Sequence, residues 1–370
     1  MIYLDNAATT PVSQVALKAA WPWLTSEFGN ASSHHELGFH AAQALKHARG
    51  VVADYLGCKA SEIIFTSGGT ESDNLGIIGL ALANPRGRHV ITSPTEHQAV
   101  LESVDFLKRI HGFSVSYLPV DQHGRVSVDS LKDQLRSDTT LVSIMYGNNE
   151  IGTVQPIADL VQVTHEAGGL FHCDAVQAVG WAAIDVKTLG IDAMSISGHK
   201  IHAPKGVGAL FVNDRVGVEP LLHGGGQEFG RRSGTENVAW AVALAEALGE
   251  IDTNQISRVV SLRDSFIEQV LNNIPQAKLT GHPEQRLPHI ASFVFEGVSG
   301  ESILVALEEK GIICSSGSAC AAGSDEPSHV LMAIGISSDL ARSAVRFSLS
   351  HATSDDDLNR TFEVLADFLR

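Results

Sequence analysis

A lysine, a histidine and two serines stand close together in the stretch Ser195-Ile196-Ser197-Gly198-His199-Lys200. The stretch follows apolar residues, so it lies where a strand is expected to end and a loop to begin. A lone lysine is most simply a solvated surface residue, because a charged amine is rarely buried without a task. Here hydroxyl and imidazole donors surround Lys200, and this combination suits a lysine that holds an aldehyde cofactor as a Schiff base beside phosphate-binding groups.

A second candidate is the turn Ser67-Gly68-Gly69-Thr70, which separates an expected strand at 62–66 from an expected helix at 71–81. Free backbone N–H groups at a helix N-terminus bind phosphate, and the glycines let the ligand approach closely. The turn lacks the glycine pattern of dinucleotide-binding folds and the Gly-Lys-Ser/Thr of nucleoside-triphosphate loops. It therefore predicts a phosphate site of another kind, although glycine is common in strand-to-helix turns.

Polar residues also follow several other apolar segments that we expect to be strands: His97 after 89–92, Asn148-Asn149-Glu150 after 140–145, and Asp174 after 169–173. In α/β folds, ligand sites gather at such carboxyl ends of strands. For His97 alone, a satisfied loop or core histidine is the simpler interpretation. Asp174 is expected to be buried and then needs a partner, which a protonated pyridine nitrogen would supply.

Cys320 lies in a segment made only of small residues, 315–324. We expect such a segment to be mobile, because it has no large side chain to anchor it. It is either a linker or a swinging loop with a reactive thiol, and Arg346 could hold a substrate carboxylate. The other cysteines, Cys58, Cys173 and Cys314, form no Cys-x-x-Cys pair, so neither a disulfide framework nor a zinc ribbon is indicated. Cys314 is either buried or a resolving thiol.

A glycine-rich segment, 224–235, carries two arginines and is too long to be only a turn. It is either a flexible surface loop or a segment at a phosphate or at a subunit interface.

The elements that must position these residues alternate between strand and helix up to about residue 250, which predicts an α/β domain with a mainly parallel sheet. Helices are expected at 13–23, 38–56 and 236–248, the second from its apolar face at helical spacing. Residues 1–13 are expected to form an extended arm, most simply a mobile terminus. After a boundary at 249–252, the remainder predicts a smaller α+β domain.

The composition of the 370 residues narrows the function. Hydrophobic residues make up 44%, as in ordinary globular proteins. The formal net charge of −16 argues against a nucleic-acid partner, because the phosphates of a nucleic acid would be repelled. The first residues resemble no secretory signal, and no apolar run reaches the length of about 20 residues that spans a membrane. We therefore expect a cytoplasmic enzyme.

Taken in order, the motifs resemble those of the cysteine desulfurases of the NifS/IscS-like group, which are pyridoxal-phosphate enzymes of the class V aminotransferase family. The resemblance runs nearly from end to end. It rests on seven segments, Tyr3–Pro11, Phe65–Asn74, Asn148–Gly152, His172–Gln177, Ser197–Lys200, Arg232–Thr235, and Ser316–Cys320 before Glu326–His329. It implies a fold-type-I architecture with a mainly parallel seven-stranded sheet. Residues 14–250 would form the large cofactor-binding domain, and residues 1–13 with 251–370 the small domain.

The resemblance also implies a role for each candidate residue. Lys200 would carry the cofactor, Asp174 would pair with its ring nitrogen, His97 would stack on the ring and Gln177 would bond the ring hydroxyl. The catalytic residues would be Cys320, Lys200 and His97, and the substrate carboxylate would bind Asn149 and Arg346. The phosphate would be held by Gly69, Thr70, Ser197, His199 and, from the other subunit of a homodimer, Thr235.

The activity implied is conversion of L-cysteine to alanine with a persulfide left on Cys320, for iron–sulfur cluster or thio-cofactor assembly. The partners would be a scaffold or another sulfur-acceptor protein. No metal site is expected, although Cys320 could contact a nascent iron–sulfur cluster. Two departures bear on the acceptor: the sequence after Cys320 is poor in threonine and serine, and the chain ends at Arg370 without the longer tail of some relatives.

Three alternatives remain. A selenocysteine lyase would need the same lysine and aspartate but could do without Cys320. A catalytically silent binding module is opposed by Lys200. A dinucleotide-binding oxidoreductase is disfavoured by the missing glycine pattern.

Overall fold

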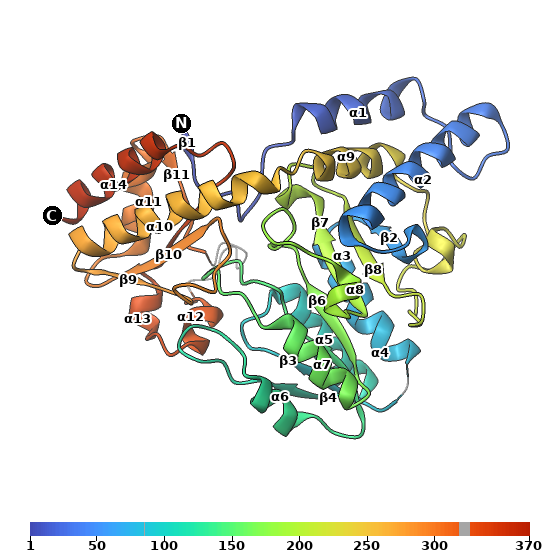
Figure 1. Ribbon diagram of the computed structural model, residues 1–370, viewed down its shortest axis with the longest axis horizontal. Helices are drawn as coiled ribbons and strands as arrows, with labels where there is room; N and C mark the ends of the chain where they lie inside the picture. The colour runs from blue at the N-terminus through green and yellow to red at the C-terminus, as the bar shows by residue number, and fades with distance from the viewer. Residues whose placement is uncertain (85, 318–325) are drawn as a thin grey trace.

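The structure, a computed structural model, describes residues 1–84, 86–317 and 326–370. Its elements form two groups, a larger one built on a seven-stranded sheet and a smaller one built on a three-stranded sheet (Figure 1). The strands of the larger sheet are β2 (Ile63–Thr66), β3 (His89–Thr92), β4 (Ser114–Tyr117), β5 (Thr139–Ser143), β6 (Leu170–Asp174), β7 (Ala193–Ser197) and β8 (Gly208–Val212).

The strand order of this sheet is β2-β8-β7-β6-β5-β3-β4. Only β8 runs antiparallel to its neighbours, and the other pairs are parallel. This confirms the predicted mainly parallel seven-stranded sheet. The carboxyl ends of β6 and β7 lie side by side, so the residues that follow them meet at one edge of the sheet.

Helices cover both faces of this sheet. Successive residues of a strand face opposite ways, so Ile63 and Phe65 join the apolar core on one face, while Ile64 joins the core on the other. One face is covered by α1 (Gln14–Thr25), α2 (Glu36–Leu56), α6 (Val128–Gln134), α7 (Ile157–Glu166), α8 (Val186–Leu189) and α9 (Val238–Gly249). The other carries α3 (Gly69–Asn74), η2 (Leu75–Gly79), α4 (Leu80–Ala83) and α5 (Gln98–His111).

The helix predicted at 71–81 begins two residues earlier and is interrupted by a wider, π-helical turn at η2. Within that turn Gly76 packs directly on His172 of β6: a Cβ on Gly76 would lie 2.7 Å from the imidazole Cδ2. Wider turns of this kind are often found next to functional sites.

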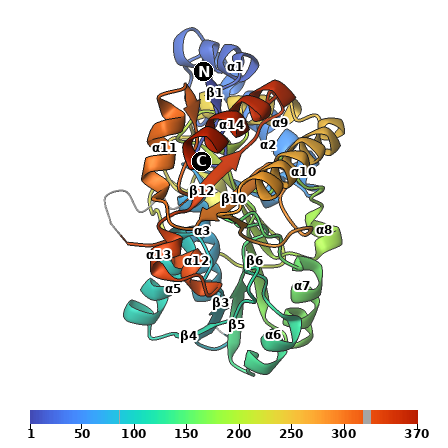
Figure 2. The same cartoon turned by 90° about the vertical axis from the view of Figure 1, so that its left-hand side faces the viewer.

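The smaller group contains the antiparallel sheet β12-β10-β9, with α10, α11 and α14 packed together over it (Figure 2). A cluster of phenylalanines, including Phe266, Phe293 and Phe347, fills its core. The elements are β9 (Ala277–Leu279), β10 (Ile290–Phe295), β12 (Val345–Ser348), α10 (Ile256–Asn273), α11 (Gly300–Glu308), α12 (His329–Ala333), α13 (Ser338–Ala341) and α14 (Asp355–Leu369).

The N-terminal arm belongs to this smaller group. Its strand β1 (Ile2–Tyr3) pairs with β11 (Ile312–Ile313), and Asn6 donates to the carbonyl of Ser348 in β12. The expectation of a mobile terminus is therefore wrong, because bonds to residues more than 300 positions away fix the arm. Short 3-10 turns complete the described chain: η1 (Ala60–Glu62), η3 (Gly198–Lys200), η4 (Glu228–Gly230) and η5 (Thr253–Gln255). None of its helices is both long and apolar enough to cross a membrane.

Candidate active site

A cavity of about 180 Å³ lies where β6, β7 and α3 meet the N-terminal arm and β12. Of the eleven predicted site residues that the structure describes, ten line it. These are Gly69, Thr70, His97, Asn149, Asp174, Gln177, Ser197, His199, Lys200 and Arg346. The residues Ala7, Ala8, Asp73, Met145, Gly147, Val176 and Gly317 complete the wall. Residues far apart in the chain therefore converge on one cavity.

Lys200 lies in the cavity at the end of η3, directly after β7. Its Nζ donates to the carbonyl oxygens of Ala7, at 2.6 Å, and Ala8, at 2.8 Å. The N-terminal arm thus holds the ammonium group in place. His202, two residues later, has a φ of 66°, a left-handed conformation that is uncommon for a residue other than glycine.

Two buried carboxyl groups line the cavity, although the sequence pointed only to one. Asp174 lies at the end of β6 and accepts a hydrogen bond from the backbone N–H of Val176. Burial raises the pKa of Asp174, while His97 and Lys200 oppose this shift. Asp73 of α3 is also buried, and its Oδ1 has no hydrogen-bond partner among the described residues. Burial, followed by the charge of Asp174, raises the pKa of Asp73 well above its ordinary value.

A buried chain of hydrogen bonds joins three neighbouring strands beneath these carboxyl groups. His172 of β6 contacts the hydroxyl of Ser143 on β5 at 2.9 Å and that of Ser195 on β7 at 3.0 Å. Burial lowers the pKa of His172 to about 3, so the imidazole is neutral. A neutral imidazole bound on both nitrogens adds no charge near Asp73 and Asp174.

His97 caps the N-terminus of α5. Its Nδ1 accepts a hydrogen bond from the backbone N–H of Ala99 at 3.1 Å. When the ring is neutral, Nε2 therefore carries the proton. The ring lines the cavity, and the hydrogen bond from Ala99 of its own helix fixes its orientation.

The turn Ser67–Thr70 leads into the N-terminus of α3, and its residues Gly69 and Thr70 line the cavity. A Cβ on Gly69 would lie 2.9 Å from Cγ2 of Val176 and 3.3 Å from Cβ of Ser197, so this position requires glycine. Burial, followed by the charge of Lys200, lowers the pKa of His199 to about 4. The neutral His199 contacts the hydroxyl of Thr9 through Nδ1.

On the side of the smaller group, Arg346 of β12 is held in two directions. It donates to the carboxylate of Asp5 and to the backbone carbonyl of Asn149, each at 2.8 Å. Its Nε is buried without a hydrogen-bond partner among the described residues. Asp5, which the sequence indicated only as part of the segment Tyr3–Pro11, therefore orients the guanidinium.

One predicted site residue that the structure describes does not line the cavity. Thr235 is exposed and lies outside its lining. Cys320 lies outside the described residues. Burial, followed by the charge of Asp5, raises the pKa of the Cys314 thiol to about 12. Cys314 is therefore a poor nucleophile, which favours the buried over the resolving role.

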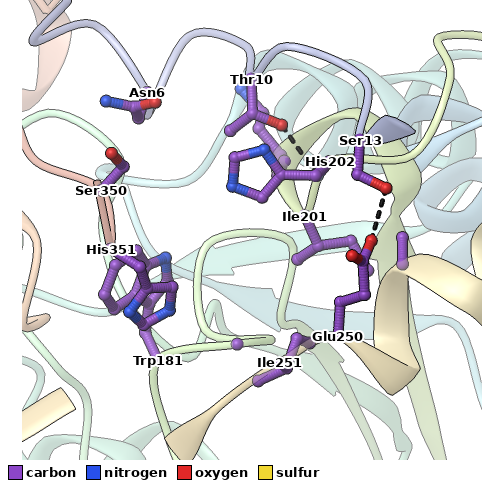
Figure 3. A pocket seen from close by; sticks show the side chains of 13 residues that line it. Asn6, Thr10, Ser13, Trp181, Ile201, His202, Glu250, Ile251, Ser350 and His351 are labelled. Atoms are coloured by element: carbon purple, nitrogen blue, oxygen red, sulfur yellow. Dashed lines mark hydrogen bonds between the residues drawn. The ribbon is translucent and has the colours of Figure 1, made fainter. Parts of the chain in front are cut away.

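A second cavity, of about 210 Å³, also has Lys200 in its lining. Figure 3 shows this cavity with Trp181, His351, His202 and Glu250 around it. It is bordered by the N-terminal arm, the end of α9 and the ring of Trp181, and Lys200 is the one predicted residue that it shares. Trp181 stacks between His289 and His351, at centroid distances of 4.4 Å and 4.6 Å. His289 in turn contacts Gln177 at 3.4 Å, so the stack supports the wall of the first cavity.

Known proteins resemble this chain over its whole length. The profile of the family "Aminotransferase class-V" matches residues 2–361. A protein of Methanosarcina thermophila named "Cysteine desulfurase IscS" is 47% identical, over 100% of this chain and 92% of its own length. A solved "NIFS-LIKE PROTEIN" superposes with a TM-score of 0.92 at 35% identity, covering 100% of this chain and 99% of the other. A structure described as "SspA in complex with cysteine" superposes with a TM-score of 0.85 at 39% identity, covering 94% and 99%.

Proposed function

We propose a division of labour between Lys200 and Cys320 for this chain, which belongs to the class V aminotransferase family and is a cysteine desulfurase of the NifS/IscS-like group. In this proposal the cavity binds pyridoxal phosphate and L-cysteine, and Cys320 receives the sulfur. The observation that carries it is the convergence of a lysine amine, a buried carboxyl group, a glycine turn and an arginine on one cavity.

The residues of the cavity fit pyridoxal phosphate. The Asp73 and Asp174 carboxyl groups lie buried together, and a cationic ring nitrogen would offset the cost of ionising one of them. Gly69 leaves space where a Cβ would collide, beside the hydroxyl groups of Thr70 and Ser197. Asp174 would hold the ring nitrogen, His97 would cover the ring, and Gln177 would contact the ring hydroxyl. Thr70, Ser197 and His199 would hold the phosphate.

When bound, this cofactor supplies an aldehyde that bonds the substrate amine and a ring that accepts electrons. Arg346 and Asn149 would hold the carboxylate of cysteine, with Asp5 keeping the guanidinium aligned. The Nζ of Lys200, as a neutral amine, would take the α-proton. The Cys320 thiolate would attack the substrate sulfur, so that an S–S bond forms while the C–S bond breaks. The electron pair of that bond stays with the carbon, and protonation gives alanine.

We also propose that the enzyme works as a homodimer. Large apolar side chains are exposed along one short segment that includes Trp21, Phe28 and Phe39, each more than 60% exposed. Thr235 is exposed on the segment 224–235 and is available to a second subunit.

Residues Cys58, Cys173 and Cys314 are free thiols, as expected in a reducing compartment such as the cytoplasm. The acceptor would be an iron–sulfur scaffold or another sulfur-accepting protein.

The test is mass spectrometry of the protein after incubation with L-cysteine. We expect alanine to form and one added sulfur atom to map to Cys320, and Cys320→Ala to lose both the added sulfur and at least about a hundredfold of the rate. Cys58→Ala is the matched control, because burial, followed by the charge of Glu62, raises the pKa of that thiol to about 12. Full desulfuration by Cys320→Ala would refute the persulfide on Cys320, and a preference for selenocysteine would then indicate the lyase.

A further inference from the structure

The open edge of β2 is covered by charged side chains instead of a strand. β2 is the first strand in the sheet order, so one of its sides has no strand partner in the described part of the chain. Every second residue along that side meets a charged group. The contacts are Arg231 to the carbonyl of Ser61 (2.6 Å), Arg49 to the carbonyl of Ile63 (2.8 Å), Glu228 to the N–H of Phe65 (3.0 Å) and Glu71 to the N–H of Ser67 (2.7 Å). We call Arg49, Glu71, Glu228 and Arg231 the charged ladder.

The charged ladder fastens the glycine-rich segment 224–235 to β2. Glu228 and Arg231 belong to this segment, and Arg49 of α2 forms a buried pair with both carboxylate oxygens of Glu228, at 2.5 and 2.9 Å. Arg232 donates to both oxygens of Glu71, at 2.8 and 3.3 Å. The segment that leads to Thr235 is therefore tied directly to the turn Ser67–Thr70.

The backbone of the segment is held in an unusual conformation. Glu228 and Phe229 have φ values of 50° and 60°, in the left-handed region that few residues other than glycine adopt. Such conformations persist where surrounding contacts over-determine them. Here Arg49 supplies those contacts, because its guanidinium also lies 5.1 Å from the centre of the Phe229 ring.

Arg232 also pairs with a negative charge close to the turn Ser67–Thr70, where the phosphate would bind. Glu71 is the third residue of α3, so its carboxylate lies within one turn of the N–H groups that would bind the phosphate. Burial acts to raise the pKa of Glu71, but hydrogen bonds from Arg232 and Ser67 outweigh it and hold the pKa below its ordinary value. An ionised Glu71 would repel a phosphate dianion unless a cation neutralised it.

We propose that Arg232 and Glu71 are positioning residues: their ion pair fixes the turn Ser67–Thr70 and the approach to Thr235 as one unit, and thereby sets the affinity for the cofactor phosphate. This inference rests on the proposed function. The alternative role of the charged ladder is only to protect an open strand edge. The two roles differ in one respect, because edge protection has no reason to depend on the phosphate group of the ligand.

The experiment titrates full-length protein, stripped of cofactor, with pyridoxal phosphate and, separately, with pyridoxal. We expect Arg232→Gln to weaken pyridoxal phosphate binding about tenfold, because a half-buried carboxylate is left unpaired beside the phosphate. Pyridoxal binding should change less than about twofold, since the ligand carries no phosphate. Glu71→Gln can still accept the N–H of Ser67, so the double variant Glu71→Gln with Arg232→Gln should recover at least about half of the lost binding free energy.

Arg231→Gln is the matched control, because it removes one positive charge from the same segment, but Arg231 contacts the carbonyl of Ser61 and the ring of Phe229 instead of Glu71. It should leave the affinity ratio of the two ligands unchanged. An equal loss of both ligands in Arg232→Gln, an unchanged affinity, or a double variant no better than Arg232→Gln would each overturn the inference. Failure of the unaltered protein to bind pyridoxal phosphate would instead overturn the proposed function.

Discussion

At the scale of single residues, Glu96 shows how the wall of the active site is built around an acid that keeps its proton. Glu96 is fully buried next to His97, and its two oxygens contact the hydroxyl of Ser93 at 2.7 Å and the N–H of Met145 at 2.9 Å. Burial raises the pKa of Glu96 from its ordinary value of 4.5 to about 8. At neutral pH the side chain is thus neutral, with one donor and one acceptor, as an amide would be.

Glu96→Gln should therefore stabilise the cofactor-free protein at alkaline pH. Because the folded-state pKa is raised, the contribution of Glu96 to stability is fully present below about pH 4.5 and is lost as the pH rises through about 8. Glutamine keeps both hydrogen bonds and does not ionise. We expect a gain of about 1–3 kcal/mol at pH 8 and none at pH 4.5, measured by denaturant unfolding. Glu102→Gln on the exposed side of α5 should show no such pH-dependent gain, and an equal gain in both variants would contradict this account.

At the scale of elements, the sequence pattern predicted what local periodicity controls and missed what distant contacts control. The strand β3 begins and ends where predicted, and α2 lies within two residues of its predicted bounds. Asp73 was missed, although it directly precedes the apolar residues of η2. A carboxylate beside such a buried helical segment is expected to be buried too, and a buried carboxylate usually has a partner. The local pattern of the N-terminal arm suggested only a mobile terminus, because the residues that fix the arm lie in β12, at the other end of the chain.

Asn6→Ala should loosen this arm. The Asn6 side chain donates to the carbonyl oxygens of Ser348, at 2.9 Å, and Tyr3, at 3.3 Å, and it is buried. Losing these bonds should cost about 1–2 kcal/mol of local stability, which corresponds to about tenfold faster hydrogen exchange or more at the amides of Ala7 and Thr10. Asn273→Ala, which removes an exposed amide from the end of α10, is the control. Unchanged exchange in Asn6→Ala would show that other contacts hold the arm.

The same loosening should reach Lys200, because the carbonyl oxygens of Ala7 and Ala8 hold its ammonium group. The arm thus connects an element at the start of the chain with the amine that gives the site its chemistry. These contacts with the arm also explain why the local pattern identified Lys200 as a candidate but could not predict what holds its side chain in position. The pattern shows donors along the chain, whereas the acceptors come from a distant segment.

At the scale of the whole molecule, the two groups of elements each have their own apolar core, and the active site lies where they meet. A boundary near residue 250 remains our prediction, supported by the end of α9 at Gly249 and the start of α10 at Ile256. Within this arrangement Thr235 is exposed and lies outside the lining of the site that its own chain builds. The homodimer that we propose therefore has a specific consequence: each complete site would need Lys200 from one chain and Thr235 from the other.

Complementation between two inactive variants tests that consequence. Lys200→Ala removes the amine, and Thr235→Glu places a carboxylate where the phosphate of the partner site would be. In a mixed dimer, one site carries both defects and the other carries neither, so co-expression should restore about a quarter of the normal activity when the chains pair at random. If Thr235 served its own chain, every site would carry one defect and no activity would return. A chain with both substitutions, co-expressed with unaltered protein, separates the cases again: about a quarter of the activity remains if Thr235 acts across the dimer, and about half if it acts within its own chain.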